Sequence, residues 1–311
     1  MNEQIGVLVM AYGGPNSLDE VEPYLLDVRG GRPAPEAVVR EVEGRYEKIG
    51  GRSPILERTR AQSDALQSAL DKQGPGFRTF VGMRHWHPYI GEVVLQMAET
   101  SIRRIVGIVM APHYSKLSVE VYFQGMARAV ESSADTLEVA HIKSWKDDPG
   151  YLDVLEARIV EGLENFPSET RSRVQLILTA HSLPERILEW NDPYPNELQE
   201  TYRRLTDRFP GQPAHFAYQS AAMTGDRWLG PDAGDLMEEL IPHGARDFLV
   251  VPIGFVSEHV EILYDIDIEY KRRIEAAGGR LERIEMPGAS LRMMSSLAHC
   301  VRRTAAESGW M

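Results

Sequence analysis

Near-continuous apolar runs rich in β-branched residues alternate with amphipathic segments along this chain, and that alternation restricts the possible folds more than any other feature. The predicted strands cover residues 5–12, 78–85, 104–112, 174–181, 215–220 and 247–255. The predicted helices between and after them include residues 55–72, 89–101, 117–132, 151–165, 195–208 and 233–241. Strands that are apolar on both faces and separated by helices form parallel sheets covered on both sides. The fold class is therefore α/β, and ligands in such sheets bind beyond the carboxyl ends of the strands.

The two halves of the chain resemble each other. "VLVMAYGGP" (7–15) and "LILTAHSLP" (176–184) share a spacing of apolar residues, alanine, a ring-bearing residue and proline. "IVMAPHYSKLSVEVY" (108–122) and "LVVPIGFVSEHVEILY" (249–264) share a strand, a proline, a serine-containing loop, Val-Glu and a closing tyrosine. Short matches also arise by chance, so duplication is a hypothesis. It predicts two related lobes, with Tyr12 and His181 at equivalent strand ends facing each other across a cleft.

Composition excludes several classes of protein. The 311 residues are 43% hydrophobic and 26% charged, which is enough for a sizeable core in two domains or in one domain with two halves. A net charge of −12 argues against a nucleic acid or an anionic membrane as partner. No segment approaches the ~20 apolar residues of a membrane span. The first residues lack a basic region and lead directly into a predicted strand, so we expect no signal peptide and a cytoplasmic protein.

Other motifs and the cysteine count narrow the chemistry further. Cys300 is the single cysteine, which excludes an internal disulfide, a thiolate zinc cage and a cysteine-ligated iron–sulfur cluster. "GGRP" and "IGGRSP" lack the spacing of nucleotide-binding glycine loops. "HSLP" lacks the surroundings of a hydrolase nucleophile.

An acidic segment follows the last predicted strand. Its carboxylates are Glu258, Glu261, Asp265, Asp267 and Glu269. At about 100° per residue, Glu261, Asp265 and Glu269 form one stripe of an α-helix whose neighbouring face is apolar. Carboxylates in a first helical turn gain about 0.3–1 kcal/mol, whereas like charges at i,i+4 cost about 0.2–0.5 kcal/mol per pair. The two energies are of similar size, so they do not distinguish a solvated acidic face from a functional row of carboxylates.

His181 ends a predicted strand, a position where histidine is commonly a hydrogen-bonded structural residue. Imidazole combined with the carboxylates of the acidic segment suits a borderline divalent metal. The sequence has no H-x-x-x-H or C-x-x-C spacing around it, so a closed structural site is not indicated. An open site that a metal passes through is the functional alternative.

Arginines and aromatic residues gather in three loop-like segments: 28–33, 43–54 and 82–89. They are either ordinary surface charges or the rim of a site for a flat, apolar ligand with carboxylates, since the arginine fork matches a carboxylate in two-point geometry.

Several motifs together resemble the ferrochelatase family, and the resemblance covers nearly the whole chain. They are "LTAHSLPERI", "GFVSEHVEILYDID", "RYEKIGGRSP", "DPYP" and "MRHWHP". "LVMAYGGP" and "APHYSKLSVEVY" are similar to the soluble bacterial branch that metallates coproporphyrin III. The protoporphyrin enzymes usually have a different residue at the position of Tyr12. The chain lacks the C-terminal cysteines of the cluster-bearing members, which are therefore not the appropriate comparison.

The resemblance implies two Rossmann-like lobes with a porphyrin cleft between them, at residues 1–145 and 146–311, the last helix packing back on the first lobe. It implies an inner metal site of His181 and Glu261, and an outer metal or proton path through Asp265 and Glu269. The implied porphyrin contacts are Tyr12, on the opposite face of the ring, with Arg29, Arg45, Tyr46, Ser53 and Tyr122. Fe²⁺ is then a substrate, and we expect no permanently bound cofactor and a monomer.

The expected reaction is insertion of Fe²⁺ into coproporphyrin III. Neutral His181 is the expected acceptor of pyrrole protons, because an ordinary imidazole titrates near working pH. Glu261 either holds the metal or takes the second proton. The alternatives are a protoporphyrin IX ferrochelatase, another metal chelatase, or a non-catalytic tetrapyrrole carrier, which would have no reason to keep a repelling carboxylate row.

Overall fold

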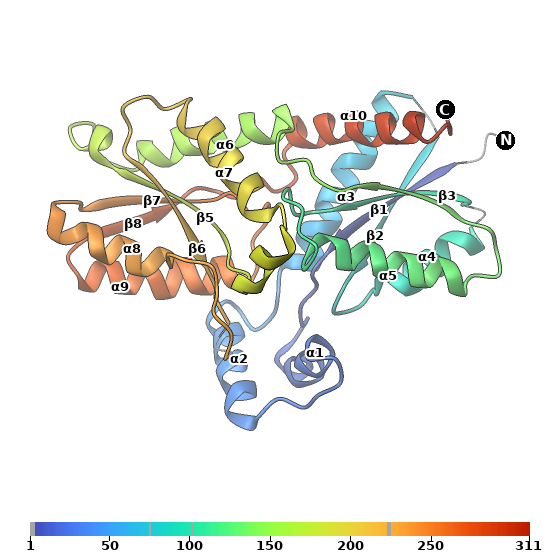
Figure 1. The fold of residues 1–311 in the computed structure, drawn as a ribbon, viewed down its shortest axis with the longest axis horizontal. Coiled ribbons are helices and arrows are strands. Elements are labelled where there is room, and N and C mark those ends of the chain that lie inside the picture. Colours follow the sequence, from blue (N-terminus) through green and yellow to red (C-terminus); the bar gives the residue numbers. More distant parts are fainter. Residues whose placement is uncertain (1–3, 75, 101, 223–224) are drawn as a thin grey trace.

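Two four-stranded parallel sheets form the molecule, as the α/β pattern predicted (Figure 1). The computed structural model describes residues 4–74, 76–100, 102–222 and 225–311. The first sheet has the order β2 (Phe77–Met83), β1 (Ile5–Ala11), β3 (Arg104–Val109), β4 (Glu138–Ile142). The second has the order β6 (Ala214–Gln219), β5 (Gln175–His181), β7 (Asp247–Pro252), β8 (Arg280–Arg283). The two halves of the chain therefore share one topology, which agrees with their sequence resemblance.

The central strands are the ones that the sequence predicts most clearly. Strands β1, β3, β5 and β7 are buried along most of their length because helices cover both faces of each sheet. Strands β4 and β8 were not predicted. They lie at the edges of the two sheets and carry polar residues, as in "EVAHI" and "RLER", so they lack the apolar run of a fully buried strand.

Helices cover the faces of both sheets. On the first lobe they are α3 (Ile55–Lys72), α4 (Ile90–Glu99) and α5 (Val119–Ser132). On the second they are α6 (Pro149–Glu164), α7 (Tyr194–Thr206), α8 (Ala233–Leu240) and α9 (Lys271–Ala276). Short 3₁₀ helices are η1 (Leu18–Glu20), η2 (Arg171–Arg173), η3 (Glu185–Trp190) and η4 (Ile241–His243). Each of the six helical segments predicted from periodicity contains a helix, whose ends differ by up to two residues from the predicted ones. Ser101, at the end of one of them, lies outside the described ranges.

The last helix, α10 (Leu291–Glu307), packs against α3, α6, β3 and β4. One apolar cluster runs through both lobes and includes Leu66, Val106, Ile159, Leu249 and Leu297. A second cluster lies between α4, α5 and the first sheet, and a third covers the other face of the second sheet. Because the first cluster is shared, the division into residues 1–145 and 146–311 stays a prediction. Within the described ranges, no helix combines the length and apolar character needed to cross a bilayer.

Two further features place side chains at the junction of the lobes. Helices α1 (Val21–Val28) and α2 (Glu36–Lys48) lie outside both sheets, below the junction in Figure 1. The acidic segment forms a π-helix over Glu261–Tyr270 that leads into α9, where the sequence predicted an α-helix. Both helix types leave residues four apart on neighbouring faces, so the periodicity did not distinguish them. π-Helical turns are rare and occur frequently at functional sites.

Candidate active site

A cavity of about 540 Å³ opens at the carboxyl ends of both sheets. Tyr12 lines it directly after β1, and Met110 directly after β3. His181, the last residue of β5, and Gly254, just after β7, line it from the second lobe. Helices α1 and α2 contribute Tyr24, Val28 and Tyr46. The equivalent ends of the two sheets therefore converge on one site, where a parallel sheet presents its ligand-binding edge.

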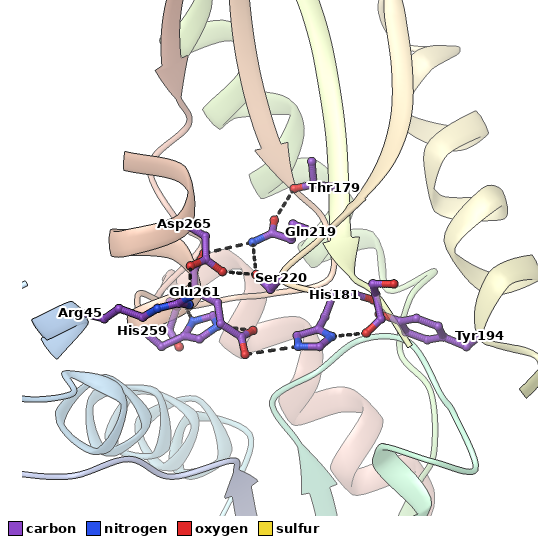
Figure 2. Close-up of polar contacts among 11 residues, drawn as sticks. Arg45, Thr179, His181, Tyr194, Gln219, Ser220, His259, Glu261 and Asp265 are labelled. Atoms are coloured by element: carbon purple, nitrogen blue, oxygen red, sulfur yellow. Dashed lines mark hydrogen bonds and ion pairs between the residues drawn. The ribbon is translucent and has the colours of Figure 1, made fainter. Parts of the chain in front are cut away.

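His181 and Glu261 meet in this cavity (Figure 2). Nε2 of His181 lies 3.3 Å from Oε1 of Glu261. Nδ1 of His181 contacts the carbonyl oxygen of Ser182, and the hydroxyl of Tyr194 donates to the carbonyl oxygen of His181 at 2.9 Å. The imidazole is therefore held at the strand end with Nε2 directed at the carboxylate.

Glu261, the first residue of the π-helix, is positioned through its backbone as well as its side chain. The buried amide of Gln219 donates to the carbonyl oxygen of Glu261 at 3.1 Å and accepts from the hydroxyl of Thr179 at 2.7 Å. Nε2 of His259 lies 3.5 Å from Oε2 of Glu261. In the part of the chain that the structure describes, no group of three or more His, Cys, Asp or Glu side chains forms a metal site. His181 and Glu261 are thus an open nitrogen–oxygen pair that could hold a metal ion.

The pair is charged in the substrate-free protein. Burial alone would lower the pKa of His181, but the charge and hydrogen bond of Glu261 outweigh it and raise that pKa to about 9. Burial likewise opposes ionisation of Glu261, yet His181 and His259 hold the pKa of Glu261 well below its usual range. His181 is therefore protonated near neutral pH. The expectation of a neutral His181 was wrong for this state, because it took the imidazole without its carboxylate partner.

The acidic row is not a continuous solvated face. Asp265 is 6% exposed; its carboxylate accepts from the hydroxyl of Ser220 and lies 3.5 Å from Nη1 of Arg45. Burial, assisted by the charges of Glu261 and Glu269, raises the pKa of Asp265 to about 6. Glu269 is partly exposed.

The other two carboxylates of the segment are engaged elsewhere. Asp267 makes two contacts with Arg283, at 2.8 and 2.9 Å, and Glu258 pairs with Arg58 at 3.1 Å. The segment thus contributes Glu261 to the cavity wall and places Asp265 behind it.

Tyrosine side chains form much of the first-lobe wall. Tyr24, Tyr46 and Tyr122 are buried, and burial raises the pKa of each phenol above its ordinary value. Tyr12 is 39% exposed. Partial burial of its phenol group raises its pKa to about 12. All of these phenols are neutral at physiological pH, so the wall supplies hydroxyl groups and ring faces without negative charge.

The structure brings together six of the ten predicted site residues at the cavity, and four lie away from its wall. Tyr12, Tyr46, Ser53, Tyr122, His181 and Glu261 line the cavity. Neither predicted rim arginine does: Nε of Arg29 donates to the carbonyl oxygen of Arg32, and Arg45 contacts Glu41 and Asp265. Asp265 and Glu269 do not line the cavity either; Asp265 lies one helical turn behind Glu261.

The sequence did not single out several lining residues: Arg84, His113, Arg186, Tyr194, Trp228 and His259. Arg84 lies in the segment 82–89 that was considered as a possible rim, but it was not named as a site residue. Arg84 directly follows β2, so the strand-end argument applied to His181 would have found it. The others lie in loops or helices whose approach to the site depends on tertiary packing.

Comparison with known proteins identifies the family. Residues 4–305 match the Ferrochelatase family. The chain is 42% identical to the ferrochelatase of Herpetosiphon aurantiacus, an alignment that covers 92% of this chain and 94% of the relative. It is 38% identical to the coproporphyrin III ferrochelatase of Geobacillus kaustophilus, with 98% and 97% covered.

Among solved structures, SirB from Bacillus subtilis, in a structure with Fe³⁺, has the same fold. The TM-score is 0.61 at 11% identity, covering 98% of this chain and 97% of the other. The sequence match over nearly the full length, together with the His181–Glu261 pair at the meeting edges of two sheets, shows that this chain belongs to the ferrochelatase family, the lyases that insert iron into porphyrin.

Proposed function

We propose that this ferrochelatase inserts Fe²⁺ into coproporphyrin III. The position of Tyr12 carries the proposal: it lines the cavity from the first lobe, at the strand end equivalent to that of His181 in the second. The resemblance associates a tyrosine at this position with the coproporphyrin branch. Relatives from Geobacillus kaustophilus and Listeria innocua carry the name coproporphyrin III ferrochelatase, whereas those from Herpetosiphon aurantiacus and Deinococcus radiodurans are named ferrochelatase alone.

The chemistry of the cavity suits this substrate. Coproporphyrin III is a flat macrocycle with a propionate on each pyrrole ring, whereas protoporphyrin IX replaces two of the propionates by apolar vinyl groups. The tyrosine-lined wall provides ring faces for the macrocycle, with Tyr46, Ser53 and Tyr122 as the proposed contacts. Arg29 and Arg45 are proposed to meet propionates at the rim. The buried Nε of Arg45 has no hydrogen-bond partner among the described residues. Because Arg45 contacts Glu41 and Asp265 and does not line the cavity, its proposed contact with a propionate requires its side chain to turn toward the ligand.

His181 and Glu261 would carry the chemistry. Loss of two pyrrole protons accompanies metal insertion, so the site must accept protons and hold the ion close to the nitrogens. His181 already bears a proton when paired with Glu261, and an approaching Fe²⁺ would compete for that carboxylate and weaken the pair. His181 can then release its proton to the carboxylate route and accept the two pyrrole protons in turn, passing on the first before it takes the second, while Glu261 holds the metal. Tyr12 is proposed as the ligand that approaches iron from the other face.

Asp265 and Glu269 would form the route by which metal or protons pass to and from Glu261. Asp265 lies behind Glu261 on the same helix, and Glu269 follows one turn later with partial exposure. An exit for protons is required because each turnover releases two of them.

The remaining assignments rest on the resemblance. We propose a cytoplasmic monomer without a resident cofactor, whose partners are the porphyrin and Fe²⁺. Sedimentation at micromolar concentration tests the monomer, and metal analysis of the purified protein tests the absence of a resident cluster.

The test of substrate identity compares Fe²⁺ insertion into coproporphyrin III and protoporphyrin IX under anaerobic conditions. We expect kcat/KM to favour coproporphyrin III by about tenfold or more, equivalent to a difference in transition-state binding of about 1.4 kcal/mol. The variant His181→Ala provides the background rate. Equal or greater kcat/KM with protoporphyrin IX would contradict the proposal.

A further inference from the structure

Arg84 projects into the cavity from the first lobe. It directly follows β2, and its backbone N–H donates to the carbonyl oxygen of Ala11 at 3.0 Å, which fixes its position beside the end of β1. Its guanidinium lies 5.8 Å from the ring centroid of Tyr12 and 5.5 Å from that of Tyr122. The cation is therefore held between two phenol rings on the cavity wall.

The guanidinium of Arg84 has no anionic partner among the described residues: its contacts are the rings of Tyr12 and Tyr122, and none of its side-chain N–H groups donates a hydrogen bond there. Arg45, by contrast, contacts two carboxylates. Ring faces attract a cation but do not satisfy the five N–H donors of a guanidinium. Arg84 thus presents unused, directional donors to whatever occupies the cavity.

A second cavity, of about 530 Å³, lies between α4 and α5 and is also lined by Arg84. Its walls include Gly91 of α4 and Gly125 of α5, and it extends to Arg128. The carboxylate of Asp27 also lines it and lies 2.9 Å from Nδ1 of His85. A Cβ atom at Gly91 would meet only Ala129, at 4.0 Å, so the missing side chain leaves the space open. Arg84 therefore stands at the junction between the main cavity and a groove with a second cation along it.

We propose that Arg84 binds one propionate of the tetrapyrrole in two-point geometry, and that this acidic arm points into the groove between α4 and α5, toward Arg128. The proposal rests on the proposed function, because it takes a propionate-bearing porphyrin as the ligand of the main cavity. A guanidinium is the side chain best matched to a carboxylate in this way. A neutral arm would gain nothing at this position, so Arg84 would select for substrates that carry a carboxylate there.

The test compares the affinities of Arg84 variants for coproporphyrin III and for its tetramethyl ester, measured by fluorescence quenching without metal. Arg84→Gln should weaken coproporphyrin III binding about 10- to 100-fold and leave ester binding unchanged, because charge-assisted hydrogen bonds are lost only with the free acid. Arg84→Lys, which keeps the charge but not the fork, should recover part of the affinity. Arg78→Gln is the matched control: Arg78 is exposed, lies over the ring of Phe80 and lines neither cavity.

Arg128→Gln tests the direction of the arm. A loss of coproporphyrin III affinity smaller than that of Arg84→Gln, but larger than that of Arg78→Gln, would support the groove. A loss equal to the Arg78→Gln control would overturn that part of the proposal. Equal losses for acid and ester in Arg84→Gln, or no loss for either, would overturn the assignment of Arg84.

The proposed function fails by a separate result, which is wild-type preference for protoporphyrin IX in the insertion assay. In that case the Arg84 variants are compared on protoporphyrin IX and its dimethyl ester. A loss of affinity for the free acid alone would then support a carboxylate-binding site at Arg84. An equal loss of affinity for the acid and the ester would contradict it.

Discussion

Nε2 of His181 lies 3.3 Å from Oε1 of Glu261, although one residue ends strand β5 and the other begins the π-helix. Each is held from its own side: His181 by Ser182 and Tyr194, and Glu261 by Gln219 through its backbone. Removing either partner leaves the other charge in a sheltered site, where an uncompensated ion is costly. The contact between His181 and Glu261 therefore fixes the positions of both side chains and also keeps both of them charged.

His181→Ala should abolish iron insertion while porphyrin affinity stays within roughly tenfold of wild type, because the tyrosine-lined wall that packs the macrocycle is unchanged. Quenching titrations and single-turnover insertion measure the two quantities separately. His215→Ala is the control, since His215 lies on β6 and contacts Gln175 outside the cavity. Near-normal turnover in His181→Ala would contradict the assignment.

Glu261→Gln should lower the pKa of His181, because the carboxylate that raises it to about 9 is gone and burial then dominates. NMR titration of the His181 ring follows this without metal or porphyrin. The raised pKa of His181 implies stability that is fully present below its ordinary value of 6.5 and is lost as pH rises through about 9. Melting temperature should thus fall more steeply over that range in wild type than in Glu261→Gln. An unchanged His181 titration in the variant would show that the pair does not form in solution.

Asp265→Asn should raise the apparent KM for Fe²⁺ more than the KM for porphyrin if Asp265 lies on the metal route. Asp267→Asn makes the same charge change on the same helix, but Asp267 pairs with Arg283. We expect this control to cost about 1 kcal/mol of stability through the lost ion pair and to leave the iron dependence unchanged. Steady-state kinetics and thermal melts on both variants are the measurements. Identical iron dependence in Asp265→Asn and Asp267→Asn would contradict a role for Asp265 in metal delivery.

Glu269→Gln examines the outer part of the same route. The partly exposed carboxylate should affect metal delivery less than Asp265, with a gain in stability of a few tenths of a kcal/mol, about that of one relieved i,i+4 repulsion. Iron-dependent kinetics at low and high ionic strength test this, since screening weakens the contribution of exposed charges. A larger kinetic defect than that of Asp265→Asn would contradict the proposed order of the two residues.

His113 should make the protein sensitive to acid. It is buried beside the cavity with Nε2 2.8 Å from Oγ1 of Thr201, and burial lowers its pKa from 6.5 to about 3. The unfolded chain then binds a proton that the folded chain does not, so stability falls as pH drops below 6.5. Relative to His113→Gln, wild type should lose roughly 2 kcal/mol between about pH 7.5 and about pH 5. Urea unfolding at the two pH values measures it; parallel losses in both proteins would contradict the assignment.

The α/β architecture, its central strands and six residues of the cavity wall were predictable from the amino-acid sequence. Central parallel strands are covered on both faces, so β1, β3, β5 and β7 are apolar along most of their length. Such runs can be recognised in the sequence without knowing which strands they pair with. The residue that follows such a run lies at the ligand-binding edge, which placed Tyr12 and His181 correctly. The family resemblance rests on local motifs and was confirmed over residues 4–305.

Which charged side chains contact each other could be learned from the three-dimensional structure alone. Arg45 contacts Asp265 across 220 positions, Asp267 contacts Arg283, and Arg84 lies between two tyrosine rings without an anionic partner among the described residues. The buried state of Asp265 follows from its tertiary neighbours, and the raised pKa of His181 follows from the nearby carboxylate of Glu261. The π-helix of the acidic segment contacts α2 and β8. Electrostatic interactions act through space and depend on the local dielectric, so local sequence patterns, which report periodicity along the chain, do not contain them.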